Sequence, residues 1–140
     1  MLAAVTIVAE IMKRDILTVE PSDSIGEAAE KMTERGVGAV VVTDFGRIIG
    51  ILTERDILKA VAYRTHSSEA RVRQWMTPDP ILVAPDTDAA EAAHIMLENN
   101  FRHLPVVDSE RPVGIVSLRD VARWSIDVHD AEHAPAAERD

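Results

Sequence analysis

The sequence contains no cysteine, which excludes disulfide bonds, thiolate metal sites, iron–sulfur clusters and thiol nucleophiles together. It also lacks long apolar runs: the longest, 39–42 and 48–52, are strand-length and far short of the ~20 residues that cross a bilayer. The first residues contain neither a basic segment nor a long apolar one, so no signal peptide is predicted. We therefore expect a cytoplasmic protein with no membrane partner.

Basic residues are scarce relative to acidic ones, since 15 Lys and Arg stand against 24 Asp and Glu, a net charge of −9. Such a surface works against phosphate backbones and anionic lipids, so nucleic acid is not expected as a partner. A nucleic-acid-binding accessory is therefore the weakest of the functions considered. The remaining composition, 46% hydrophobic and 28% charged over 140 residues, is that of one ordinary globular domain.

A tandem duplication accounts for most of the chain. A shift of 64 residues aligns 12–58 with 76–122 without a gap. The alignment contains 16 identities in 47 positions, against about 3 expected from average residue usage. The fold must therefore be built from two similar units.

Each copy predicts the order β-α-β-β-α, a mixed α/β (α+β) unit. An extended segment, 17–19 or 81–83, is ended by Pro21 or Pro85. The following helix is bounded by capping signals, namely Ser24 with Glu27, Asp88 with Glu91, and the C-cap residues Gly36 and Asn100. Two continuous apolar strands come next, at 39–43 and 48–52 or at 104–107 and 113–116, before a second helix from Thr53 or Ser117.

The repeats also set the expected boundaries. We expect the first repeat at 8–63, a polar linker at 64–71 and the second repeat at 72–126. Residues 127–140 are predicted to form a mobile acidic tail, because they have no apolar stripe. His129 and His133 could share a helix face as metal ligands, but the polar context favours a solvated tail.

The strongest functional signal occurs twice, at 50–56 and 114–120. Each segment has a glycine in a buried strand, a hydroxyl residue at a helix N-cap, and then Arg and Asp in the first turn. Capping alone explains the hydroxyl and the acid, but not the arginine or the glycine. A strand that feeds a helix N-terminus is an anion site by geometry. Because an arginine fork suits phosphate and a carboxylate suits the neighbouring hydroxyls of a ribose, the pattern indicates a nucleotide.

Together these motifs resemble a tandem pair of CBS domains, or Bateman module, the regulatory module named after cystathionine β-synthase. The resemblance covers 8–124 and rests on the Gly-to-Asp segments, the two prolines, Ile11-Met12 with Trp75-Met76, and the run Leu-Pro-Val-Val-Asp at 104–108. It implies two β-α-β-β-α repeats packed through their sheets about a pseudo-twofold axis, with two clefts for adenosyl ligands. It also implies a homodimer formed through exposed apolar residues of the second helices, namely Ile57, Leu58, Val61 and Val121.

The resemblance assigns roles to particular residues. Asp56 and Asp120 would hold the ribose hydroxyls of the two clefts, and Thr53 and Ser117 would bond the ribose or the α-phosphate. Each cleft would be completed by the other copy. Around Asp120, Ile115 of the same copy would be joined by Lys13, Thr18, Val37 and Gly38 of the first, and around Asp56, Ile51 would be joined by Thr77, Leu82, Phe101 and Arg102 of the second. Phosphates would be neutralised from Arg55, Arg119, Arg102 and His103.

The two copies differ where the second has the Arg102-His103 pair and the first has Gly38-Ala39. The two clefts should therefore differ in affinity. The sequence does not assign Arg102 and His103 to one cleft, and for His103 packing and ligand binding both stay open.

We therefore expect a non-catalytic sensor that binds AMP, ADP or ATP, or a related adenosyl ligand such as NADH or S-adenosylmethionine. With a polyphosphate, Mg²⁺ is a candidate companion ion. No Ser-His-Asp order, metal-ligand spacing or Walker-type loop occurs, and the regulated protein partner is left open. The alternative is a ligand-free structural dimerisation module in which Asp56 and Asp120 only cap helices.

Overall fold

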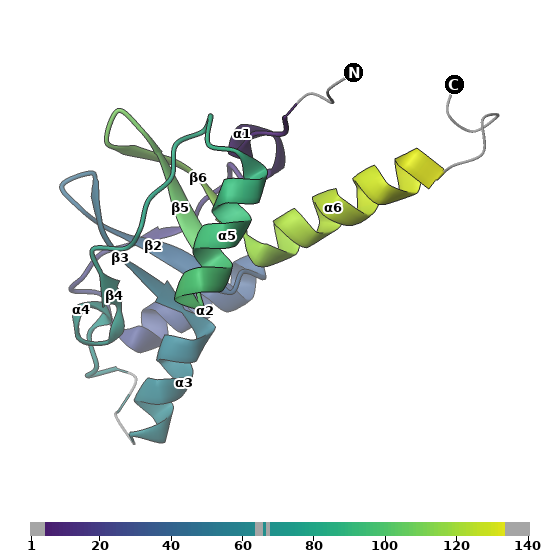
Figure 1. Cartoon of the computed structure of the whole chain (residues 1–140). Helices are drawn as coiled ribbons and strands as arrows, with labels where there is room; N and C mark the ends of the chain where they lie inside the picture. The colour runs from purple at the N-terminus through teal and green to yellow at the C-terminus, as the bar shows by residue number, and fades with distance from the viewer. Residues whose placement is uncertain (1–4, 64–65, 67, 134–140) are drawn as a thin grey trace.

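Two β-hairpins lie at the centre of the protein in the computed structural model, which describes residues 5–63, 66 and 68–133 (Figure 1). In the first copy, β2 (Ala39–Asp44) pairs antiparallel with β3 (Arg47–Thr53). In the second copy, β5 (His103–Asp108) pairs in the same way with β6 (Arg111–Ser117). Both hairpins contain a register shift at the equivalent position near the turn. The predicted hairpins are confirmed, with each strand slightly longer than expected.

The first hairpin is widened on both sides into a four-stranded sheet. β1 (Thr18–Val19) lies parallel to β2, and β4 (Thr77–Pro78) lies antiparallel to β3. The strand order is therefore β1-β2-β3-β4. Since β4 comes from the segment that leads into the second copy, the sheet of the first copy is completed by the second.

The second hairpin has the same neighbours, reduced to single-residue bridges. Val83 bridges parallel to Val106, and Lys13 bridges antiparallel to Ile115. The strand predicted over 81–83 is therefore limited to the bridge at Val83. Because Lys13 lies at the start of the first copy, the two halves exchange their entry segments and are tied together by backbone hydrogen bonds.

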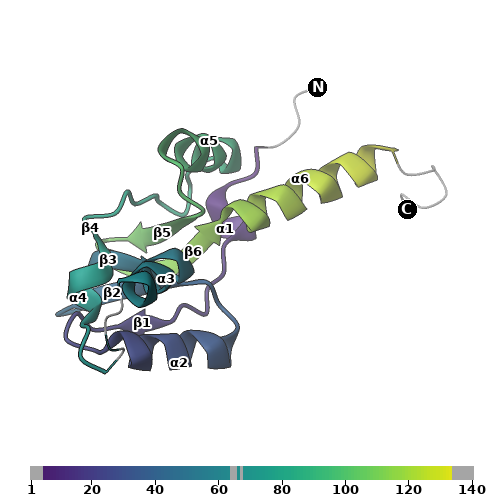
Figure 2. The same cartoon turned by 90° about the horizontal axis from the view of Figure 1, so that it is seen from below.

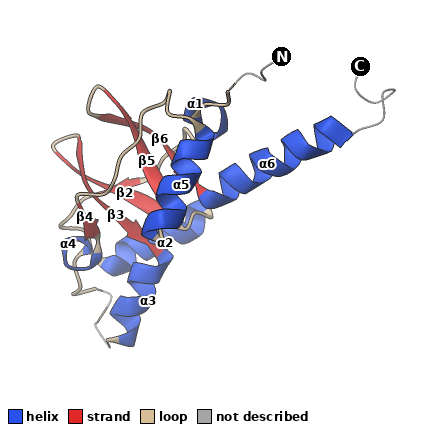
Figure 3. Cartoon of the chain, in the orientation of Figure 1, coloured by secondary structure: helices blue, strands red, loops and turns tan. Residues whose placement is uncertain are grey.

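Helices enclose the strands from outside. Figure 2 shows α2 (Ile25–Arg35) and α5 (Ala89–Asn99) on opposite sides of the molecule with the strands between them. Figure 3 shows the same arrangement, with the strands in the centre and the helices around them. The fold is thus a mixed α+β structure of two repeats, as the sequence predicted.

All four predicted cap residues lie at the ends of these two helices. Ser24 Oγ accepts a hydrogen bond from Glu27 N at 3.0 Å. Gly36 and Asn100 end α2 and α5 in the left-handed conformation, with φ of +65° and +57°. Asp88 is the N-cap residue of α5, as predicted, but its side chain makes no capping hydrogen bond, and that turn is held by backbone contacts to residues 6 and 7.

Each copy has its own hydrophobic core, and each core is completed by the other copy's entry segment. Val8 of α1 (Val8–Ile11) packs with Met96 and Val116 in the second core. Val72 of α4 (Val72–Trp75) packs in the first core. The burial of these residues fixes the two copies relative to each other, and hence the clefts between them.

The two remaining helices are α3 (Glu54–Ala62) and α6 (Leu118–His133). The mobile tail predicted from residue 127 is a helix over 127–133, and residues 134–140 lie outside the described part. No proline or glycine interrupts this stretch, and the first proline, Pro135, follows the helix by two residues. Among the described residues, no helix has the length and apolarity that crossing a bilayer requires.

Candidate functional site

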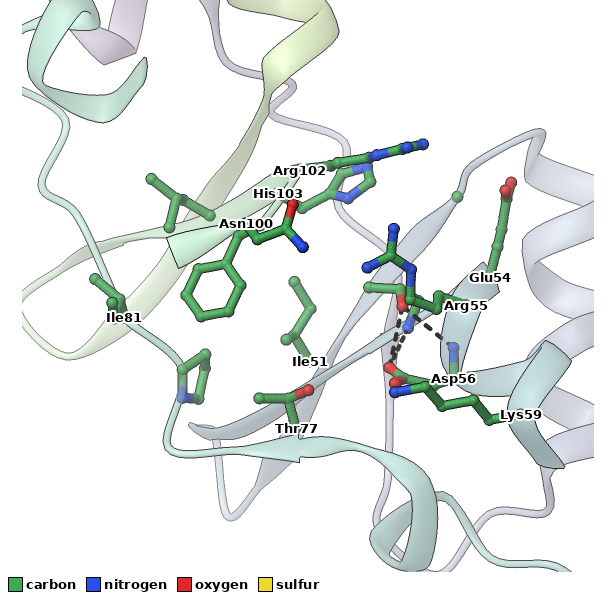
Figure 4. Close-up of a pocket in the computed structure, with 15 residues that line it drawn as sticks. Ile51, Glu54, Arg55, Asp56, Lys59, Thr77, Ile81, Asn100, Arg102 and His103 are labelled. Carbon is green, nitrogen blue, oxygen red and sulfur yellow. Dashed lines mark hydrogen bonds between the residues drawn. The ribbon is translucent and has the colours of Figure 1, made fainter. Parts of the chain in front are cut away.

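A cavity of about 280 Å³ lies where the end of β3 and the start of α3 face the loop that leads into β5 (Figure 4). The first copy supplies Thr53, Asp56 and the strand residue Ile51. The second copy supplies the loop residues Phe101 and Arg102. A molecule bound here would therefore contact both repeats at once.

Asp56 is the buried acid of this cavity, with 9% of its surface exposed. Its Oδ2 accepts hydrogen bonds from Thr53 N at 2.9 Å and from Thr53 Oγ1 at 3.1 Å, drawn as dashed lines in Figure 4. These contacts confirm that Thr53 and Asp56 cap α3. Within the described residues, Asp56 Oδ1 has no hydrogen-bond or ion-pair partner, so one carboxylate oxygen is left for a donor in the cavity.

Cations gather around this acid although the chain as a whole carries −9. Arg55 and Lys59 reach the cavity from α3, and Arg102 reaches it from the loop before β5. Only Glu54 and Asp56 oppose them, so the local charge favours an anion.

Part of the lining, the apolar wall, is apolar. It consists of Ile51, Pro80, Ile81, Phe101 and Leu104. Thr77 and Asn100 add polar groups to the lining. The cavity therefore combines a face for a flat apolar group, a free carboxylate oxygen and a cluster of cations.

His103 lines the same cavity, and it also interacts electrostatically with Asp120 of the second copy. Burial lowers the pKa of its imidazole from the ordinary value of 6.5, while the negative charges of Asp120 and Glu54 oppose that shift and Arg102 adds to it. The neutral form is therefore favoured in the folded protein. The structure assigns both Arg102 and His103 to the lining of the Asp56 cavity, a choice that the sequence left open.

This shift predicts acid-dependent destabilisation. Below pH 6.5 the unfolded chain protonates His103 more readily than the folded chain, so the free energy of unfolding should fall as the pH is lowered through this window. Replacing His103 by alanine, the residue at the equivalent position 39, should remove this part of the slope. Urea unfolding of both proteins at pH 5.5 and 7.5 measures it, and equal slopes in the two would contradict the assignment.

The Asp120 cleft has the same capping geometry. Ser117 N donates to Asp120 Oδ2 at 2.9 Å, and Asp120 N donates to Ser117 Oγ at 3.0 Å. Its second oxygen differs from that of Asp56, because Lys13 Nζ lies 3.9 Å from Asp120 Oδ1. The bridge between Lys13 and Ile115 makes these two predicted residues neighbours, and their place in a ligand cleft with Asp120 stays a prediction.

Five predicted cleft residues need correction or lie elsewhere. Leu82 does not line the cavity; Ile81 does, because this segment is irregular and lacks the alternation of a strand. Gly38 lines the Asp56 cavity, whereas it was assigned to the Asp120 cleft. Val37 borders a separate shallow hollow with Ile57. Arg119 is exposed on α6 and does not line the Asp56 cavity, and Thr18 is an exposed residue of β1.

The sequence reasoning missed six residues of the cavity, namely Glu54, Lys59, Pro80, Ile81, Asn100 and Leu104. A signal existed for Lys59, since it follows Arg55 by four residues and so shares its helix face. The loop residues had no such signal, because no period governs an irregular segment.

A family model described as the CBS domain matches residues 8–63 and 72–127. The chain belongs to the CBS-domain family. It is 43% identical to an uncharacterized 17.7 kDa protein of Acidianus ambivalens, over 95% of this chain and 81% of that protein. It is also 35% identical to the inosine-5'-monophosphate dehydrogenase of Methanocaldococcus jannaschii, but it spans only 22% of the length of that protein.

Solved CBS pairs have the same fold, and two of them hold adenosyl ligands. The CBS pair of protein MJ0100, in complex with 5'-methylthioadenosine and S-adenosyl-L-methionine, has a TM-score of 0.83 at 29% identity and covers 89% of this chain and 99% of its own. CBSX2 in complex with AMP has a TM-score of 0.74 at 28% identity, over 88% and 98%. A CBS-CP12 protein from bloom-forming cyanobacteria, 26% identical with a TM-score of 0.84 over 90% and 75%, is hexameric.

Proposed function

We propose that this CBS protein is a non-catalytic regulatory module that binds an adenosine mononucleotide in the Asp56 cavity. The observation that carries the proposal is Asp56 Oδ1, which has no partner among the described residues and belongs to a residue that lines the cavity together with an apolar wall and a cluster of cations. Two vicinal hydroxyls donate well to such an oxygen. The adenosyl ligands of the solved CBS pairs support the same chemistry.

The shape and charge of the cavity favour one class within the adenosyl ligands. The adenine would lie on the apolar wall that includes Ile51 and Phe101, and the phosphate would meet Arg55, Lys59 and Arg102. A volume of about 280 Å³ is at the low end for small-molecule sites, which favours a mononucleotide over a dinucleotide such as NADH. The cations disfavour the positive sulfonium of S-adenosylmethionine. With ADP or ATP, Mg²⁺ would offset the additional phosphate charge.

Regulation follows from the position of the cavity between the repeats. A ligand that touches both copies favours the arrangement in which they are closest, and it shifts the equilibrium by its difference in affinity for the two arrangements. The output would be a changed surface for a separate protein partner in the cytoplasm.

We also propose that the protein is a homodimer, with one correction to the expected surface. Leu58 and Val61 of α3 are 68% and 61% exposed, in keeping with a contact face. Ile57 is half-buried and can still contribute to this face. Val121 cannot, because it belongs to the second core, with 7% of its surface exposed. The contact would therefore centre on α3, and sedimentation velocity reads the assembly state directly.

A thermal-shift panel tests ligand binding. AMP, ADP, ATP with and without Mg²⁺, NADH and S-adenosylmethionine are each added at increasing concentration. A ligand present at 100 times its Kd should add about 2.7 kcal/mol to the free energy of unfolding. We expect the adenine mononucleotides to give the largest shifts. No shift with any of them would favour the structural dimerisation module instead.

A further inference from the structure

The two clefts differ at the position that pairs with the isoleucine of the central strand. In the Asp56 cleft this position is Thr77, which pairs with Ile51. In the Asp120 cleft it is Lys13, joined to Ile115 by two backbone hydrogen bonds of 2.9 Å. The residues are 64 positions apart and thus equivalent in the repeat. A four-carbon ammonium side chain therefore stands in one cleft where a short hydroxyl side chain stands in the other.

Lys13 lies beside the carboxylate oxygen of Asp120 that the helix cap does not use. Asp120 Oδ2 is occupied by Ser117 N at 2.9 Å, and its Oδ1 faces Lys13 Nζ at 3.9 Å. One oxygen of this carboxylate is therefore hydrogen-bonded and the other faces an ammonium group, from a lysine side chain that is 65% exposed beside an aspartate side chain that is 11% exposed. Asp56 uses Oδ2 in the same cap but keeps Oδ1 without a partner among the described residues.

A ribose diol needs the oxygen that Lys13 holds. To reach Asp120 Oδ1, its hydroxyls must compete with an ammonium group that lies 3.9 Å from this oxygen, and they must also displace the stem that carries it. The neighbouring strand offers no room for a retreat of the backbone, because Gly114 already faces Lys13 O closely enough for an added Cβ to lie 2.8 Å from it. The Thr77 hydroxyl imposes neither cost on a ligand at Asp56.

We propose that Lys13 is a specificity-determining residue that closes the Asp120 cleft to adenosine ligands, so that the chain binds one nucleotide, at Asp56. This inference rests on the proposed function of the Asp56 cavity. The two clefts of the CBS pair then differ in nucleotide binding, although their two capping motifs have the same geometry.

Isothermal titration calorimetry with AMP tests the inference through a reciprocal exchange. The unchanged protein should bind one AMP per chain. Lys13→Thr, which gives the Asp120 cleft the residue found at position 77, should bind two, the second within about tenfold of the first. Thr77→Lys should lose at least tenfold in affinity, because it places an ammonium group beside Asp56. Adding Asp56→Ala to Lys13→Thr should return the stoichiometry to one and so locate the new site.

Two further variants separate the local effect of Lys13 from a general loss of charge, and the effect of its charge from that of its stem. Lys31→Thr removes the same charge from an exposed position on α2 and should leave one AMP per chain. Lys13→Gln keeps most of the stem without the charge, and it provides the same readout if Lys13→Thr does not fold. Two AMP per unchanged chain, or one AMP per chain in both position-13 variants, would overturn the inference while leaving the proposed function intact. No AMP binding by the unchanged protein or by Lys13→Thr would instead overturn the proposed function.

Discussion

Replacing Asp56 by alanine should weaken the binding of AMP by about 100-fold or more, and leave the weak binding of pyrophosphate nearly unchanged. The free Oδ1 is the group that would accept from the ribose hydroxyls, and hydrogen bonds to a charged partner contribute about 1.5–3 kcal/mol each. Pyrophosphate has no ribose and would use only the cations of the cavity, such as Arg55 and Arg102. Calorimetric titration of both ligands measures the two losses.

The control for this variant must remove a helix cap without touching the cavity. Gln74 provides it, because it occupies the same third helical position in α4, accepts a hydrogen bond from the N-cap backbone, Arg71 N, at 2.8 Å, and lies outside the cavity lining. Both Asp56→Ala and Gln74→Ala should lower the free energy of unfolding by roughly 1 kcal/mol. Only Asp56→Ala should lose AMP. An equal loss of AMP and pyrophosphate in Asp56→Ala would contradict the ribose role and favour capping alone.

Replacing Gly114 by alanine should lower the free energy of unfolding by about 1–3 kcal/mol, the cost typical of overpacking a filled interior. A Cβ at this position would lie 2.6 Å from Met12 Sδ and 2.8 Å from Lys13 O. The thioether can move, but the carbonyl belongs to the bridge with Ile115 that ties the two copies together. Chemical unfolding of the variant and of the unchanged protein gives the difference.

Gly36 supplies the comparison for a glycine that has space around it. It adopts φ of +65° with no atom within 4 Å of an added Cβ, and the equivalent Asn100 adopts φ of +57°. Gly36→Asn should therefore change the free energy of unfolding by less than about 0.5 kcal/mol. If Gly114→Ala were as mild as Gly36→Asn, the close approach of Lys13 to β6 would be wrong.

Local signals in the sequence were sufficient for the repeating unit and for one half of the site. The caps at Ser24, Gly36 and Asn100 depend on residues within one helical turn, so their prediction required no knowledge of distant contacts. The same holds for Thr53 and Asp56, whose capping pair depends only on a spacing of three residues. At Asp88 the helix start was predicted correctly, but the side-chain cap is absent and backbone contacts to residues 6 and 7 hold that turn.

The sequence by itself determined that two similar β-α-β-β-α units exist and that each presents an acid at a helix start, because periodicity, capping and repetition are properties of short segments. Only the tertiary structure decided that Arg102 and His103 join Asp56, that Ile81 replaces Leu82, and that Lys13 faces Asp120. These outcomes depend on how one copy packs against the other. That packing is determined by the burial of side chains in both cores and by the exchange of two entry segments, and no short window of residues contains this information.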